Sequence, residues 1–259
     1  MNRKQIFLSA MDKDEAGAAG ILKGIQSAGM DAEGHFWDTT DKDLTRALPH
    51  REIEKADAWV ILASRKLTSD EQIGLTLTLM SARAWRKSRL PVLIVGPEQA
   101  LPPLLADAAE FCPPEKLTTR LAVRTSIAKK WNEQELRICV RFQSGVGIWI
   151  EAGPSQGETW KGVLLGVDPA LGGAIDFQAV GPRGSLPERT VLEHPMKDAR
   201  LSAGETEYVA WGCSNTLTSE DSFFVRLKGL TSSLLLGEGL AEEDSMECRV
   251  IRLTAQAEA

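Results

Sequence analysis

Polar residues at the end of a predicted strand over 5–9 are the first candidates for chemistry in this sequence. Ser9, Ala10 and Asp12 lie where the strands of open α/β sheets form ligand-binding crevices at their carboxyl ends. These residues therefore predict a binding loop. A structural alternative is equally open, because Asp12 or Asp14 could cap the helix predicted to follow.

An aromatic ring and an acidic loop follow the second predicted strand. The indole ring of Trp37 could stack on a flat ligand ring, or it could pack in the core. Asp38 begins a loop made acidic by Asp41 and Asp43, which would repel a dinucleotide unless a cation or Arg46 lay between them. A solvated loop is the alternative interpretation of this charge run.

Sites that need clustered ligands are not supported by the spacing. The cysteines and histidines are scattered along the chain: Cys112, Cys139, Cys213, Cys248, His35, His50 and His194. Zinc and iron sites need ligands at closer spacing, so we expect no metal site and four free, mostly buried thiols. The glycine-rich stretch 166–173 lacks the Lys-Ser/Thr pair of a phosphate loop, and no Ser-His-Asp arrangement is evident.

The elements that position these candidates alternate between apolar runs and helical patterns, which is typical of a parallel sheet flanked by helices. Strands are expected over 5–9, 35–37, 58–63 and 91–96, with an edge strand over 110–112. Helices are expected over 14–28, 44–53, 101–109 and 117–131, with a further helix starting at 69. Ser69 and Gln72 predict a capping box for that further helix. We expect residues 1–133 to form an α/β domain.

The second half of the sequence has a different pattern of apolar and polar residues. Alternating apolar and polar residues over 136–142, 147–150 and 223–227, and a last strand over 246–253, predict a mainly-β sandwich or barrel in residues 134–259. Residues 1–150 carry 21 Lys and Arg against 19 Asp and Glu, whereas residues 151–259 carry 9 against 17. This acidic balance argues against direct nucleic-acid binding by the second half.

Three segments in the first half, taken in order, carry a family resemblance. They are Ile6-Phe7-Leu8-Ser9 with Asp12-Lys13-Asp14, then Phe36-Trp37-Asp38, then the stretch from Leu44 to Ser64. Together they resemble the first strand and loop, the second strand, and the segment up to the third strand of Toll/interleukin-1 receptor (TIR) domains. The resemblance covers residues 5–131 and implies a flavodoxin-like fold.

The resemblance also implies a ligand and a set of site residues. Many TIR domains cleave the glycosidic bond of NAD with a Glu on the helix after the third strand, so NAD is a possible substrate or ligand here. An alignment without gaps from Ser64 places that Glu near Thr76. The nearest acid, Glu71, lies about five residues earlier and is turned by roughly 140° on a helix. Glu71 is the catalytic candidate if the loop realigns, and the ligand-binding candidates are Ser9, Ala10, Asp12, Trp37, Asp38 and Ser64.

The leading hypothesis is a TIR-like prokaryotic defence or signalling protein. Its N-terminal half would be a degenerate nucleotide-binding or protein-interaction module, and its β-rich half would serve in sensing or assembly. The first alternative is an NAD glycohydrolase activated by self-assembly. The second is a nucleosidase similar to the nucleoside deoxyribosyltransferases, whose acidic, glycine-containing segment resembles Asp70-Glu71-Gln72-Ile73-Gly74.

Partners and location follow from the same hypothesis. We expect other TIR-like subunits or a defence complex as partners, and a homo-oligomer is possible. The apolar run at the N-terminus is too short for a signal peptide, and no stretch approaches about 18 uninterrupted apolar residues. A cytoplasmic protein without a membrane span is therefore expected.

Overall fold

The structure is a computed structural model that describes residues 3–37, 50–85, 90–126, 137–143, 147–239 and 247–254. The chain divides into two compact units, Met1–Glu133 with Ala255–Ala259, and Gln134–Thr254. The boundary expected between residues 133 and 134 lies outside the described residues. Each unit has its own sheets and is described by itself.

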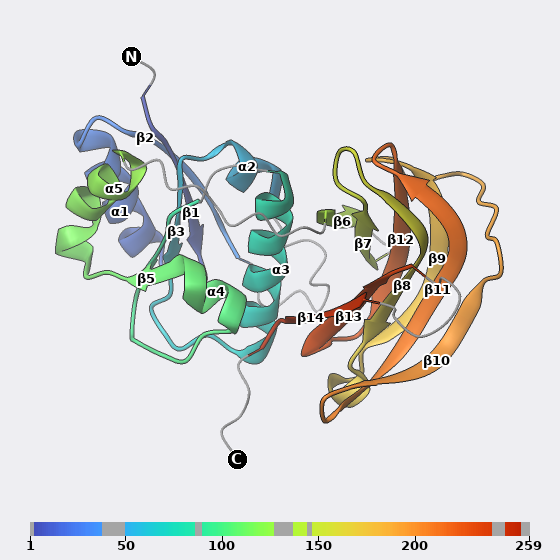
Figure 1. The fold of residues 1–259 in the computed structure, drawn as a ribbon. Helices are drawn as coiled ribbons and strands as arrows, with labels where there is room; N and C mark the ends of the chain where they lie inside the picture. The colour runs from blue at the N-terminus through green and yellow to red at the C-terminus, as the bar shows by residue number, and fades with distance from the viewer. Residues whose placement is uncertain are drawn as a thin grey trace. The chain divides into compact units, whose positions relative to one another are not determined.

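The N-terminal unit is built on a five-stranded parallel sheet (Figure 1). Its strands are β1 (Gln5–Ala10), β2 (Asp31–Phe36), β3 (Ala58–Leu62), β4 (Val92–Val95) and β5 (Ala109–Phe111). They lie in the order β2-β1-β3-β4-β5, which is that of flavodoxin-like doubly wound sheets. The expected α/β flavodoxin-like fold is therefore confirmed at the level of strand order and direction.

Helices cover both faces of this sheet (Figure 1). They are α1 (Glu15–Ser27), α2 (His50–Lys55), α3 (Ser69–Trp85), α4 (Pro103–Ala108) and α5 (Leu117–Ser126), with a short 3₁₀ helix η2 at Pro114–Lys116. Side chains alternate between the faces of a strand, so Ile6 and Leu8 of β1 share one core with α1 and α5. Ser9 points to the opposite face, where it meets His35 and Trp59.

Two predicted helices extend beyond what the structure describes. The first turns of the helix expected over 44–53 fall outside the described residues, and α2 spans His50–Lys55. The end of the helix expected over 117–131 also falls outside them, after α5 at Ser126. The second strand is longer than predicted and begins at Asp31. It lies at the edge of the sheet, where polar residues are tolerated, and its polar residues did not give a strand pattern in the sequence.

The C-terminal unit consists of two antiparallel sheets (Figure 1). One has the order β10-β11-β8-β13-β14 and the other the order β6-β7-β12-β9. The strands are β6 (Arg137–Gln143), β7 (Gly147–Gly153), β8 (Thr159–Val167), β9 (Ala174–Pro182), β10 (Met196–Ala203), β11 (Thr206–Thr218), β12 (Asp221–Lys228), β13 (Ser233–Glu238) and β14 (Glu247–Arg252), with a 3₁₀ helix η3 at Pro169–Leu171. The β-rich character expected of this half is confirmed.

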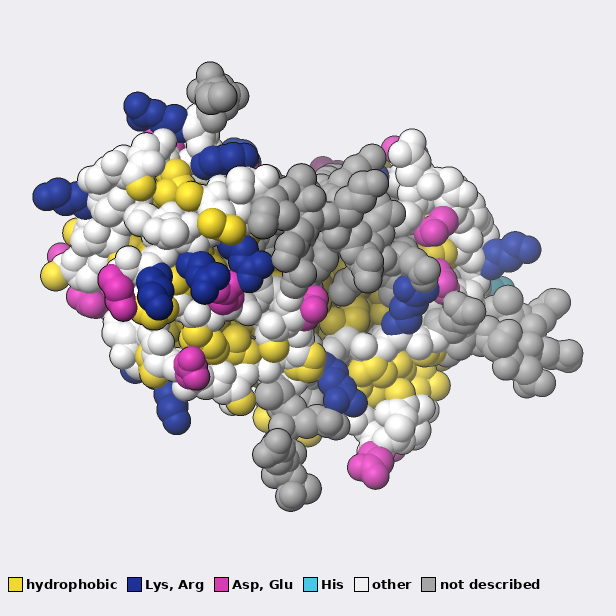
Figure 2. Space-filling view, turned by 60° about the vertical axis from the view of Figure 1, so that its left-hand side comes forward, with side chains coloured by type: hydrophobic (Ala, Val, Ile, Leu, Met, Phe, Trp, Pro, Cys, Tyr) yellow, Lys and Arg dark blue, Asp and Glu magenta, His cyan; other side chains and the backbone are white. Residues whose placement is uncertain are grey.

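The cysteines are free thiols, and surface charges of both signs are mixed on the face shown in Figure 2. Cys112, Cys139 and Cys213 are buried free thiols, and Cys248 is an exposed one. Lys and Arg side chains are interspersed with Asp and Glu on the face shown in Figure 2, rather than gathered in a patch of one sign. No helix within the described part of the chain has the length and apolar character needed to cross a membrane.

Candidate functional site

The loops after β1 and β3 meet at the carboxyl edge of the parallel sheet. In this strand order the carboxyl ends of β1 and β3 form the topological switch point, where open α/β sheets bind ligands. The N–H of Met11 donates to the carbonyl of Leu62 at 2.8 Å and joins the two strand ends. Gly96, after β4, approaches so closely that a Cβ there would overlap the carbonyl oxygen of Ala63.

Arg65, in the loop after β3, links two carboxylates across this edge. Its Nε donates to Oδ1 of Asp12 at 2.7 Å, and its terminal nitrogen lies 2.5 Å from Oε1 of Glu71. The exposed fraction is 45% for the Arg65 side chain, 21% for Asp12 and 3% for Glu71. Burial lowers the pKa of Arg65, but Glu71 and Asp12 outweigh it and raise that pKa above its ordinary value. We call Asp12, Arg65 and Glu71 the Arg65 cluster.

Glu71 also caps the helix on which it lies. The N–H of Thr68 donates to Oε2 of Glu71 at 2.8 Å, and the N–H of Glu71 donates back to Oγ1 of Thr68 at 3.4 Å. This reciprocal pair is a capping box. Oε2 of Glu71 accepts from Thr68 and Oε1 accepts from Arg65, so both carboxylate oxygens accept a hydrogen bond. The box predicted for Ser69 and Gln72 is therefore wrong by one residue, and the Gln72 amide instead donates to the carbonyl of Ala100.

Asp12 has a different role from the neighbouring acid in its loop. Asp14 caps α1 by accepting a hydrogen bond from the N–H of Gly17 at 2.9 Å, which decides between the two capping candidates. Asp12 is left to pair with Arg65 through Oδ1. Its other oxygen, Oδ2, is buried and has no hydrogen-bond partner among the residues that the structure describes. Within the described ranges, the cluster therefore keeps one acceptor without a donor.

A neutral polar network lies in the core beside this edge. The Trp59 indole N–H donates to Oγ of Ser9 at 2.9 Å, and the same Oγ lies 2.9 Å from Nε2 of His35. The His35 ring packs against Phe7 and against the edge of Trp37. Burial lowers the pKa of His35 to about 4, against a smaller opposing effect of Glu52. His35 is therefore uncharged near neutral pH.

The structure thus separates the predicted ligand-binding residues. Asp12 and Glu71 come together through Arg65, and Ser64 is exposed in the same loop. Ser9, Ala10 and Trp37 are buried, and the N–H of Trp37 donates to the carbonyl of Ala10. Asp38 lies outside the described residues.

Sequence reasoning missed the residue that links the site. Arg65 directly follows Ser64, after the apolar strand predicted over 58–63. Its position at the end of that strand was the signal that could have identified it. His35 and Trp59 gave no signal, because their contacts with Ser9 depend on pairing between strands. Within the described ranges no group of three or more His, Cys, Asp or Glu side chains could hold a metal ion.

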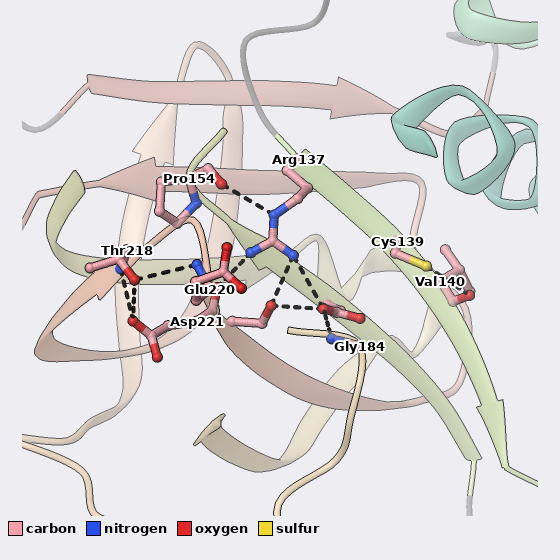
Figure 3. Close-up of polar contacts among 10 residues, drawn as sticks. Arg137, Cys139, Val140, Pro154, Gly184, Thr218, Glu220 and Asp221 are labelled. Atoms are coloured by element: carbon pink, nitrogen blue, oxygen red, sulfur yellow. Dashed lines mark hydrogen bonds and ion pairs between the residues drawn. The ribbon is translucent and has the colours of Figure 1, made fainter. Parts of the chain in front are cut away.

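The C-terminal unit contains a second charged cluster, formed by Arg137, Glu151 and Ser222 (Figure 3). The guanidinium of Arg137 donates to the Glu151 carboxylate, the Ser222 hydroxyl, and the carbonyls of Pro154 and Asp221. The exposed fraction is 9% for the Arg137 side chain and 1% for Glu151. Burial lowers the pKa of Arg137, against the opposing charge of Glu151. We call these three residues the Arg137 cluster.

Comparisons with known proteins identify no family. No protein-family model matches the chain, and no curated protein matches it. An archaeal flavodoxin structure is similar at 13% identity and a TM-score of 0.32, covering 48% of this chain and 99% of that one. The Francisella novicida lysine decarboxylase is similar at 11% identity and a TM-score of 0.30, covering 48% of this chain and 18% of that one.

Proposed function

We propose that this chain is a TIR-like signalling protein whose N-terminal unit binds a nucleotide without hydrolysing it. One observation carries the proposal: both carboxylate oxygens of Glu71, the acid nearest the expected catalytic position, already accept hydrogen bonds within the unit. The proposal places the chain in a prokaryotic defence or signalling complex, with other TIR-like subunits as partners. The β-rich unit would then serve in sensing or assembly.

The engaged carboxylate argues against glycoside cleavage on physical grounds. An acid that assists cleavage of an N-glycosidic bond must reach the sugar or the leaving group as positive charge develops. Glu71 would first have to leave the N–H of Thr68 and the guanidinium of Arg65. Loss of a helix cap alone costs about 1 kcal/mol, and the freed Arg65 would keep only Asp12. The resting arrangement of Glu71 therefore disfavours hydrolysis.

An assay of NAD cleavage tests the proposal directly. Purified full-length chain at high concentration, incubated with NAD and analysed for nicotinamide by chromatography, is expected to release none. Deoxynucleosides, analysed for free base in the same way, test the nucleosidase alternative. Release of either product by the unaltered chain, abolished by Glu71→Gln, would overturn the proposal and establish Glu71 as the catalytic acid.

Stability measurements on two variants distinguish a capping role from a catalytic one. Glu71→Gln keeps an amide oxygen that can accept from the N–H of Thr68, so the capping box survives. Glu71→Ala removes the box and the contact with Arg65, and we expect it to cost about 1–2 kcal/mol in the free energy of unfolding. Chemical denaturation should rank Glu71→Ala below Glu71→Gln. Equal stability of the two would contradict the capping role.

A further inference from the structure

Strand β14 is the last strand of the five-stranded sheet in the C-terminal unit, so one of its sides pairs with no strand of that sheet. It pairs with β13 along its whole length without a register shift. The N–H of Leu253 donates to the carbonyl of Ser232 at 2.7 Å and continues this register. Hydrogen-bonded pairs alternate along an antiparallel ladder, so the backbone N–H and C=O groups of Cys248 and Val250 point away from β13.

Two other sheet edges of this unit are protected, in contrast to β14. At the edge of β9 the N–H of Val180 donates to Oγ1 of Thr190, whose hydroxyl donates back to the carbonyl of Val180. The same strand ends at Pro182, which has no N–H. At the edge of β10 the register shifts within residues 196–199. Covering segments, prolines and bulges prevent sheet edges from pairing with other chains, and β14 has no bulge and no proline over its described length.

The side chains in the middle of β14 are accessible. Cys248 and Val250 lie on the same face of the sheet, because residues two apart in a strand point to the same side. Both are exposed, and the exposed fraction of Val250 is 41%. A strand added to this edge would bind through backbone hydrogen bonds, and the side chains opposite each other would decide which strand fits.

A second copy of β14 meets these requirements. Two identical strands that pair antiparallel about a two-fold axis form a closed dimer. An axis at Val250 places the two exposed valines opposite each other, Cys248 opposite Arg252, and Arg249 opposite Ile251. β-Branched pairs stabilise a sheet, and in this register no like charges lie directly opposite each other. An axis at Arg249 would instead place two arginines face to face.

We propose that two copies of this chain associate through β14, antiparallel and centred on Val250. The five-stranded sheets of the two copies then form one continuous sheet across the dimer. This inference goes beyond the proposed function, because it rests on the β-rich unit alone and does not depend on nucleotide binding.

Complementary charge variants test the interface and its register. Sedimentation velocity of the full-length chain should show a reversible monomer–dimer equilibrium. Val250→Lys and Val250→Glu each place like charges opposite each other at the axis and should weaken the dimer at least about tenfold. An equal mixture of the two variants should dimerise again, because Lys then lies opposite Glu. Val191→Lys is the matched control, at a valine that is 81% exposed and lies outside the strands, and it should leave the dimer unchanged.

Amide hydrogen exchange tests the same interface without a substitution. The N–H groups of Cys248 and Val250 should exchange at least about tenfold more slowly at concentrations where the dimer forms. The N–H of Ile251, which points toward β13, should change less.

Four results would overturn the inference. They are a chain that stays monomeric up to about 0.1 mM, a dimer that Val250→Lys leaves intact, a dimer that Val191→Lys weakens equally, and charge variants that do not associate when mixed. Circular dichroism of each variant checks that it is folded. Release of nicotinamide from NAD is measured separately, so failure of the proposed function is distinguished from failure of this inference.

Discussion

Each unit contains an ion pair between an Arg and a Glu, but the two pairs differ in burial and in how completely their polar atoms are hydrogen-bonded. In the Arg137 cluster the guanidinium makes four hydrogen-bonding contacts and the carboxylate of Glu151 also accepts from Ser222 and from the N–H of Gly184. In the Arg65 cluster the guanidinium is nearly half exposed and one carboxylate oxygen has no described partner. The Arg137 cluster is buried and its charges are paired, whereas the Arg65 cluster keeps one buried acceptor without a donor among the described residues.

Position in the fold explains this difference. Arg137 begins β6 and reaches Asp221 and Ser222 at the start of β12, so its contacts tie the start of the unit to a segment far along the chain. Arg65 lies in a loop between β3 and α3 and ties that loop to the one after β1. Burying an ion pair is tolerated only when every group is satisfied. In the loops at the sheet edge the Arg65 side chain is 45% exposed, so water can solvate this guanidinium.

The largest expected effect is loss of the carboxylate from the Arg137 cluster. Glu151→Gln leaves the buried guanidinium of Arg137 without a counter-charge, and removal of one partner from a buried pair costs about 3–5 kcal/mol. Chemical denaturation of the full-length chain, followed by circular dichroism, measures this loss. The matched control is Glu207→Gln, in an exposed pair with Arg200, which should cost about 0–1 kcal/mol. Similar losses in both variants would remove the distinction between the two clusters.

An intermediate effect is expected from the neutral network beside the Arg65 cluster. The unfolded chain protonates His35 below about pH 6.5, whereas burial delays protonation in the folded chain to a pKa of about 4. Between these values the unfolded chain binds more protons, so stability rises with pH in this window. The contribution of His35, about 3 kcal/mol, is complete above about pH 6.5 and is lost as the pH falls through about 4.

Replacement of His35 isolates this contribution. His35→Gln keeps a polar side chain near Ser9 but removes the titration. Denaturation midpoints of the variant should change less between pH 4 and pH 6.5 than those of the unaltered chain. If the two pH profiles run parallel, folding does not lower the pKa of His35, and His35 is not the buried neutral group that this interpretation requires.

The fold of the N-terminal unit was predictable because its strongest signals are local. The nearly continuous apolar run of β3 indicates a strand buried on both faces, and the alternation of strands and helices indicates a parallel sheet. Edge strand β2 was less visible, since its polar residues carry little periodicity. The C-terminal unit was predictable in class from its alternating residues, but the pairing of β8 with β11 and β13 links distant segments that no local pattern reports.

The candidate site was predictable only in part for the same reason. Strand ends place Asp12 and Ser64 at one edge, whereas the link through Arg65 joins residues 53 positions apart. The capping box was misplaced because Thr68 with Glu71 and Ser69 with Gln72 follow the same sequence pattern. Tertiary contacts select between them: Arg65 binds Glu71, and the Gln72 amide binds the carbonyl of Ala100.

The smallest effect is expected for Asp12→Asn, the same exchange of carboxylate for amide as Glu151→Gln. The Asn oxygen can still accept from Nε of Arg65, and Arg65 keeps Glu71 as a counter-charge. Because Arg65 is nearly half exposed, we expect the free energy of unfolding to change by less than about 1 kcal/mol in the same denaturation experiment. A loss as large as that of Glu151→Gln would make Asp12 a structural ion like Glu151. A small loss would instead show that Arg65, already paired with Glu71 and nearly half exposed, depends little on the charge of Asp12.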